Sequence, residues 1–131
     1  MASVTSACDV YKKQGIMTAS PIELVIMLYD GCLRQLRAAK TNIINHNYQD
    51  ANKALQRTQD IVAELSSSLD CRVEISHQLM QIYEYVTWKT REINATKDAG
   101  QVDEIEGIMS GLKDAWVQIK GSCSIAYLQE G

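Results

Sequence analysis

Apolar residues recur along this chain at the spacing of amphipathic helices, in four segments that short polar stretches separate. The first predicted helix begins at Ser20-Pro21 and runs to about Asn45. Ser20 and Glu23 form a capping box, in which both side chains accept hydrogen bonds from free backbone amides. Pro21 suits the first turn of a helix, where no backbone amide donor is required. The polar residues 45–50 then predict a short connection.

Three further segments predict helices of comparable length. The second helix is expected over about Asp50 to Ser67, the third over about Val73 to Ala95, and the fourth over about Gln101 to Lys120. A turn at 69–72 separates the second from the third, and Gly100 marks the end of the third.

Each predicted helix has one apolar face. The face of the first helix is broad and consists of Ile22, Val25, Ile26, Leu28, Tyr29, Cys32, Leu33, Leu36, Ala39 and Ile43. The second helix presents Ala51, Leu55, Thr58, Val62, Leu65 and Leu69. The third presents Ile75, Leu79, Ile82, Val86 and Ile93. The fourth presents Ile105, Ile108, Met109, Leu112, Trp116 and Ile119.

Four such helices bury their apolar faces most simply as an antiparallel, up-down-up-down four-helix bundle. The sequence therefore predicts an all-α fold with a single domain over 20–120. A flexible N-terminal arm at 1–19 precedes the bundle, and a small, polar, flexible tail at 121–131 follows it.

Some apolar residues fall off these predicted core faces. On the first helix the flank holds Leu24, Met27, Gly31 and Ala38, where large groups alternate with residues small enough for another backbone to approach. On the third helix the apolar residues off the core face are Met80, Tyr85 and Trp88. Singly exposed apolar residues are normal, but contiguous apolar surface marks an interaction site. The two flanks are therefore predicted to bind an amphipathic helix laid into a groove.

Composition and charge argue against several classes of function, among them nucleic-acid binding and membrane insertion. The formal net charge is -3, which gives no general attraction to nucleic acid or anionic lipid. The longest apolar stretch, 24–29, is far shorter than the roughly 20 residues that cross a bilayer, so no membrane insertion is expected. No secretory signal begins the sequence, and the cytosol is the expected location. The four cysteines form no Cys-x-x-Cys pair and are interpreted as free thiols.

The sequence contains no recognisable catalytic motif, and we expect neither an enzyme nor a bound metal or cofactor. Glu74 and His77 have the spacing of carboxylate-bridged metal bundles, but the motif occurs once and lies opposite the predicted core face. Gly107-x-x-x-Gly111 indicates close helix packing or has no role outside a membrane. The basic residues Arg34, Arg37 and Lys40 are interpreted as a solvated face.

Several stretches resemble the flagellar export chaperones of the FliS family, in order and over nearly the whole chain. They are Tyr11 followed by 18–31 (TASPIELVIMLYDG), then 64–70 (ELSSSLD), 78–85 (QLMQIYEY), 92–95 (EINA) and 112–116 (LKDAW). The resemblance implies a helical bundle that binds the C-terminal segment of newly made flagellin and prevents premature polymerisation. It also implies delivery of flagellin to a component of the flagellar type III export gate.

The resemblance further implies that the N-terminal arm covers part of the groove until cargo displaces it. Tyr11, Ile16 and Met17 are the apolar residues of this arm that we expect to bind. A different class of protein fits the same helices, namely a regulator or scaffold that recognises a helix of another protein. The sequence leaves the oligomeric state open between a monomer and a weak dimer.

Overall fold

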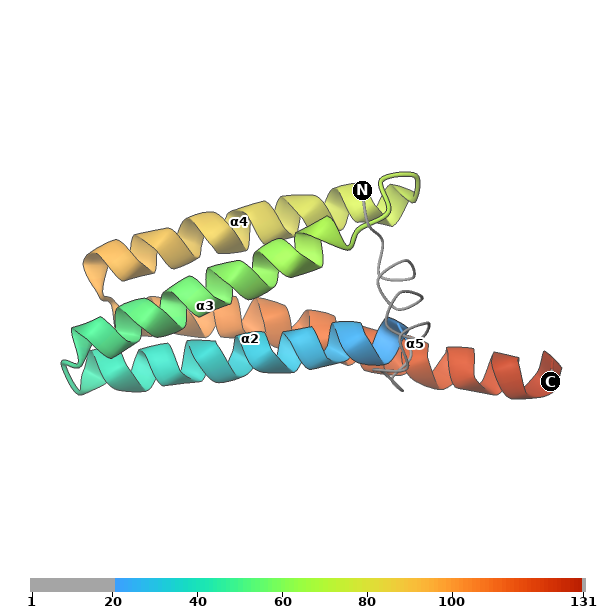
Figure 1. Ribbon diagram of the computed structural model, residues 1–131, viewed down its shortest axis with the longest axis horizontal. Coiled ribbons are helices and arrows are strands. Elements are labelled where there is room, and N and C mark those ends of the chain that lie inside the picture. The colour runs from blue at the N-terminus through green and yellow to red at the C-terminus, as the bar shows by residue number, and fades with distance from the viewer. Residues whose placement is uncertain (1–20, 131) are drawn as a thin grey trace, which may run out of the picture.

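The computed structural model describes residues 21–130, with side chains described from Ile22 to Gly121. The described chain forms α2 (Pro21–Ile44), α3 (Tyr48–Ser67), α4 (Glu74–Thr96), the short 3-10 helix η1 (Ala99–Gln101) and α5 (Val102–Glu130). Consecutive long helices run in opposite directions (Figure 1). The predicted antiparallel, up-down-up-down bundle is thus confirmed for the described residues.

The helix boundaries follow local chemistry. Pro21 is the first residue of α2, as its fixed φ predicts, whereas Ser20 of the expected capping box lies outside the described residues. The α2–α3 connection is only residues 45–47, and His46 within it has a φ of 61°. Histidine adopts this left-handed region more often than most other residues with a side chain. The His46 Nδ1 lies 2.8 Å from the Tyr48 hydroxyl.

The end of α4 differs from its prediction. Lys97, and not Gly100, takes the left-handed position after the helix, with a φ of 55° and its amide donating to the Ile93 carbonyl. The Lys97 ammonium also donates to Asn94 Oδ1 at 2.7 Å, which anchors this turn. Gly100 lies in η1, where its amide donates to Asp98 Oδ1 at 3.0 Å.

The last helix is longer than expected. The sequence predicted an end near Lys120, but α5 continues to Glu130 and extends past the ends of the other three helices (Figure 1). The residues after Lys120 include no proline, so none of them prevents the helix from continuing. Flexibility of 121–131 stays a prediction.

The four helices form a ring with unequal sides. Helix α2 packs extensively against α3 and α5, and α3 packs against α4, whereas α4 meets α5 over a much shorter length. Helices α2 and α4 are therefore at opposite corners. The predicted faces of α2 and α3 are confirmed in their main residues, which include the fully buried Tyr29, Leu36, Leu55 and Thr58.

The predicted faces of the other two helices need correction. Ile75 on α4 is 53% exposed and Ile119 on α5 is 44% exposed, although both were expected in the core. The predicted Leu79, Val86 and Ile93 of α4 are buried as expected, and the rest of its buried face consists of Ser76, Tyr83 and Thr90. Helix α4 packs against α3 and makes little contact with α5. The side of α4 that would meet α5 is therefore left uncovered near the first turn of α4.

Candidate functional site

The predicted flank on α2 lies on the outside of the bundle. Met27 is 59% exposed and Ala38 is exposed, whereas Leu24 and Gly31 are half-buried. A Cβ atom on Gly31 would meet Ile61 Cδ1 of α3 at 3.4 Å. Gly31 therefore lies against α3, and the approach of a foreign backbone at this position stays a prediction.

The three apolar residues of α4 that were predicted to lie off its core face are on two different sides of the helix. The rings of Tyr85 and Trp88 are exposed, with centroids 5.9 Å apart, and the Lys89 ammonium lies 5.8 Å from the Trp88 centroid. Met80 is half-buried, and at about 100° per residue it lies about 140° around the helix from Tyr85. Met80 thus belongs to a different side of α4 from the aromatic pair.

The two predicted flanks do not line one groove, because α2 and α4 stand at opposite corners of the ring. The flank of α2 borders α3, whereas the aromatic pair on α4 borders α5 through Tyr85. Tyr11, Ile16 and Met17 lie outside the described residues. Binding by any of these predicted residues remains a prediction.

Tyr85 links α4 to α5. Its hydroxyl donates to Glu104 Oε1, and this hydrogen bond to a carboxylate raises the pKa of Tyr85 above its usual value. Seven residues further along α5, on the same helix face, stands Gly111. A Cβ atom on Gly111 or on Gly107 would find no atom within 4 Å. Close packing, one of the two interpretations of this glycine pair, is therefore wrong.

Two exposed isoleucines, Ile75 and Ile119, could not be recognised as exposed from the sequence. Ile75 and Ile119 were assigned to the core because their spacing continues the apolar faces of their helices. Gly107 and Gly111 lie on the exposed side of α5 and give no signal for these residues.

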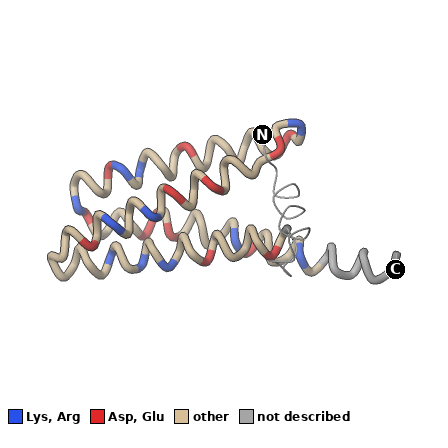
Figure 2. The backbone as a smooth tube through the Cα atoms, in the orientation of Figure 1, with Lys and Arg blue, Asp and Glu red and all other residues tan. Residues whose placement is uncertain are grey.

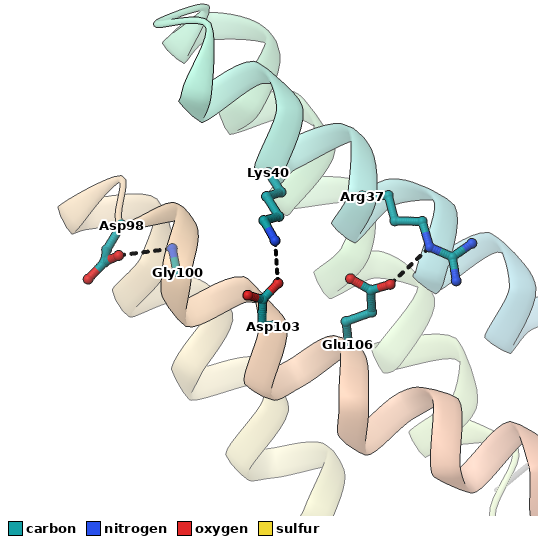
Figure 3. A network of polar contacts seen from close by, with 6 residues as sticks. All are labelled: Arg37, Lys40, Asp98, Gly100, Asp103 and Glu106. Carbon is teal, nitrogen blue, oxygen red and sulfur yellow. Dashed lines mark hydrogen bonds and ion pairs between the residues drawn. The ribbon is translucent and has the colours of Figure 1, made fainter.

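Ion pairs tie α2 to α5 along their outer edge. Glu23, Asp30, Arg37 and Lys40 pair with Lys120, Lys113, Glu106 and Asp103 in that order. Figure 3 shows two of these pairs, Arg37 with Glu106 at 2.9 Å and Lys40 with Asp103 at 2.6 Å. The hydrogen bond to Asp103 raises the pKa of Lys40. Arg34 and Arg37 are exposed and Lys40 is partly exposed, as the predicted solvated face requires, and Arg37 and Lys40 also pair with carboxylates of α5.

Chemistry at the described surface is sparse. Among residues with described side chains, no group of three or more His, Cys, Asp and Glu could hold a metal ion, and Glu74 and His77 are both exposed. Charged residues of both signs are spread along the helices (Figure 2). Within the part of the chain that was searched, no helix is long and apolar enough to cross a membrane.

Comparison with known proteins gives one consistent picture. A family model described as "Flagellar protein FliS" matches residues 4–122. The chain is 34% identical to the flagellar secretion chaperone FliS of Bacillus subtilis over 108 residues, covering 82% of this chain and 81% of that protein. It is 28% identical to the flagellar secretion chaperone FliS of Salmonella typhimurium over 126 residues, covering 94% and 93%.

A solved structure shares the fold. It is described as a flagellar chaperone from bacteria and matches with a TM-score of 0.75 at 21% sequence identity. The match covers 88% of this chain and 96% of that chain. The helical bundle is therefore an arrangement already seen in a chaperone.

Proposed function

This chain belongs to the FliS family of flagellar proteins, and we propose from that membership that its cargo is the C-terminal segment of flagellin. The protein would act in the cytosol, where it holds flagellin back from premature polymerisation. It would then deliver flagellin to a component of the flagellar type III export gate. No step of this function requires catalysis.

One observation carries the proposal, namely large apolar side chains left exposed on the outside of a bundle whose core is already complete. Met27, Ile75, Tyr85, Trp88 and Ile119 are each more than two-fifths exposed, while the core residues behind them are buried. Such surface is unfavourable in water and marks a site for another protein. In a family of secretion chaperones, an aggregation-prone cargo segment is the partner that fits.

The chemistry of the cargo agrees with this surface. A segment that is disordered alone and helical when bound must expose apolar groups until a partner covers them. Ordering such a segment costs conformational entropy, which lowers the affinity gained from each unit of buried area. A moderate affinity suits a chaperone that must release its cargo at the export gate.

Binding of purified flagellin tests the proposal directly. Isothermal titration should show a one-site interaction with flagellin from the same organism. Truncation of the flagellin C-terminal segment should abolish the interaction. Unchanged binding to the truncated flagellin would refute the proposed cargo site, and absence of binding to both would favour a regulator or scaffold that recognises a different helix.

A further inference from the structure

Helix α4 moves away from the rest of the bundle toward its first turn. Ile75 and Ile93 lie on the same side of α4, because a separation of 18 residues makes about five complete turns. Ile93 is fully buried, whereas Ile75 is 53% exposed. Figure 1 shows the same divergence, since α4 and α5 are close at the end near η1 and separate toward the start of α4. One face of α4 is therefore covered at one end and open at the other.

The first half of α4 makes few contacts with the core. Val86 is fully buried, but Leu79 two turns earlier is already 8% exposed. Leu79 and Ile82 are the large apolar side chains of residues 74–82 that pack on the core. The remaining buried residue of this segment is the small Ser76. Segments with few buried apolar contacts open at a lower free energy than the rest of a protein.

Polar contacts to other helices begin at Tyr83. Its hydroxyl forms a hydrogen bond with the Tyr29 hydroxyl of α2, and two residues later the Tyr85 hydroxyl donates to the Glu104 carboxylate of α5. No side chain of residues 74–82 makes a hydrogen bond or an ion pair with another helix of the described chain. The two tyrosines are thus the first polar ties that hold α4 in the bundle.

The second half of α4 is also tied to α3. Asn94 Nδ2 donates to Asn52 Oδ1 at 2.5 Å, and Arg91 Nε donates to Gln59 Oε1 at 3.3 Å. These contacts and the two tyrosines hold the second half of α4 on three neighbouring helices. The first half has no comparable ties.

The start of α4 has no side-chain cap. Val73 occupies the position before the first helical residue with an extended backbone, and no side chain accepts an amide of the first turn there. Serine, threonine, aspartate and asparagine can accept such an amide, whereas valine cannot. The first turn therefore gains no stability from its own end.

We propose that residues 74–82 form a lid over one side of the core, and that this lid opens as a single unit about the contacts of Tyr83 and Tyr85. In the open state Leu79 and Ile82 leave the core, while the second half of α4 stays on α3. Because opening breaks few apolar contacts and no polar side-chain contact to another helix, it costs far less than global unfolding. The lid is a property of the free protein and requires no partner.

Hydrogen exchange of single amides, measured by NMR under native conditions, tests the lid. Amides 78–82 bond within α4, whereas the first four amides of a helix have no partner in it. We expect amides 78–82 to share one opening free energy and one dependence on urea, both lower than those of amides 90–94. Fraying of the helix end predicts instead that protection rises step by step from 78 to 82. Such a gradient would overturn the lid.

Adding a cap to α4 gives the second test. Val73→Asp should provide a carboxylate that accepts a first-turn amide, and it should spare the core because Val73 is 47% exposed. If the lid opens as one unit, exchange of all amides 78–82 should slow by about fivefold. Val117→Asp on α5 is the matched control, since Val117 is also 47% exposed, and it should leave these rates unchanged. Slowing confined to the amides nearest Val73 would reject a single unit.

The boundary of the lid is tested at Tyr85. Tyr85→Phe keeps the ring and removes the hydroxyl that donates to Glu104, so opening should extend further along α4. Amides 84–88 should then exchange about three- to tenfold faster. Tyr48→Phe is the matched control, because its hydroxyl is also exposed and also contacts one side chain, that of His46. Equal rates at 84–88 in the two variants would overturn Tyr85 as the boundary.

Discussion

Two tyrosine hydroxyls meet in the centre of the bundle. Tyr29 of α2 and Tyr83 of α4 are both almost completely buried, and their hydroxyls form a hydrogen bond across the diagonal of the ring. The Trp116 side chain of α5 also forms a hydrogen bond with Tyr29. Burial raises the pKa of both phenols. Three helices are thus joined by polar groups inside the core.

Removing one of these hydroxyls should leave a buried polar group without its partner. Tyr83→Phe is expected to lower the free energy of unfolding by about 1–3 kcal/mol. Tyr29→Phe should cost at least as much, because Trp116 then loses a partner as well. The double variant Tyr29→Phe/Tyr83→Phe should lose less than the sum of the two single changes, as measured by urea unfolding. Additive losses would show that the hydroxyls do not interact.

Adjacent residues on α2 should respond differently to a carboxylate. Met27 is 59% exposed, so Met27→Asp should change stability by no more than about 0.5 kcal/mol. Leu28 packs partly against the core, and Leu28→Asp should unfold the chain or lower its melting temperature strongly. Met27→Asp should weaken flagellin binding. Circular dichroism melts and titration with flagellin check both variants.

Alkaline pH should destabilise the fold. Burial raises the pKa of the Cys32 thiol to about 12 from an ordinary value near 9. A folded-state pKa above the unfolded one means that this stabilisation is complete below about pH 9 and is lost as pH rises toward 12. Each such group lowers the free energy of unfolding by about 1.4 kcal/mol per pH unit in that window.

The pH prediction has a simple test. Urea unfolding of wild type and Cys32→Ala should be compared at neutral and alkaline pH, where the variant is expected to lose less stability between the two. Equal losses would show that Cys32 does not titrate in this range. The buried tyrosines shift in the same direction, so part of the loss should persist in the variant.

At the scale of elements, the α2–α5 edge sets the register of the two helices. Moving along α2 by seven, seven and three residues moves the partner on α5 back by the same steps. The charges on α2 change from acidic to basic halfway along the edge. A slip of one heptad would therefore place Asp30 against Glu106 or Arg37 against Lys113, both of them like-charge pairs.

Charge reversal tests this register. Lys113→Glu should lower the free energy of unfolding by about 1 kcal/mol or less, because the Asp30 pair is partly exposed. Asp30→Lys combined with Lys113→Glu should recover most of that loss, and high salt should reduce the difference between the variants. A double variant no more stable than Lys113→Glu would contradict a direct interaction.

The buried face of a helix is hard to predict from sequence when it includes residues with hydroxyl groups, because their burial depends on hydrogen-bond partners inside the fold. The buried face of α3 was predicted almost residue by residue, because its aliphatic side chains follow a simple helical period. On α4 the sequence favoured Ile75 over Ser76 and left out Tyr83 and Thr90. Thr90 can be buried because its hydroxyl donates to the Val86 carbonyl of the same helix at 2.7 Å. Periodicity alone cannot reveal such internal partners.

The candidate site was less predictable than the fold. Apolar residues off the core face could be found by helical geometry, as Met27, Tyr85 and Trp88 show. Which of these residues lie close together depends on which helices are neighbours and on how closely α4 packs against α5. The apolar pattern along the sequence does not give that information. For this reason the sequence placed Ile75 and Ile119 in the core, whereas they border an uncovered face.

At the scale of the whole molecule, the helices should differ in local stability. Helix α2 packs extensively on two neighbours, whereas the first turns of α4 pack mainly on α3. Amide hydrogens of residues 78–82 should therefore exchange faster than those of residues 32–36 in the free protein. Equal exchange rates in the two helices would contradict the uneven packing.

The solvent-exposed positions of Gly107 and Gly111 also have a meaning for evolution. Each glycine costs a helix interior about 1 kcal/mol relative to alanine, and here neither glycine gains a packing contact in return. Selection for stability alone would replace them, since alanine fits without any clash. Homologues under stronger selection for stability would thus be expected to carry alanine at positions 107 and 111.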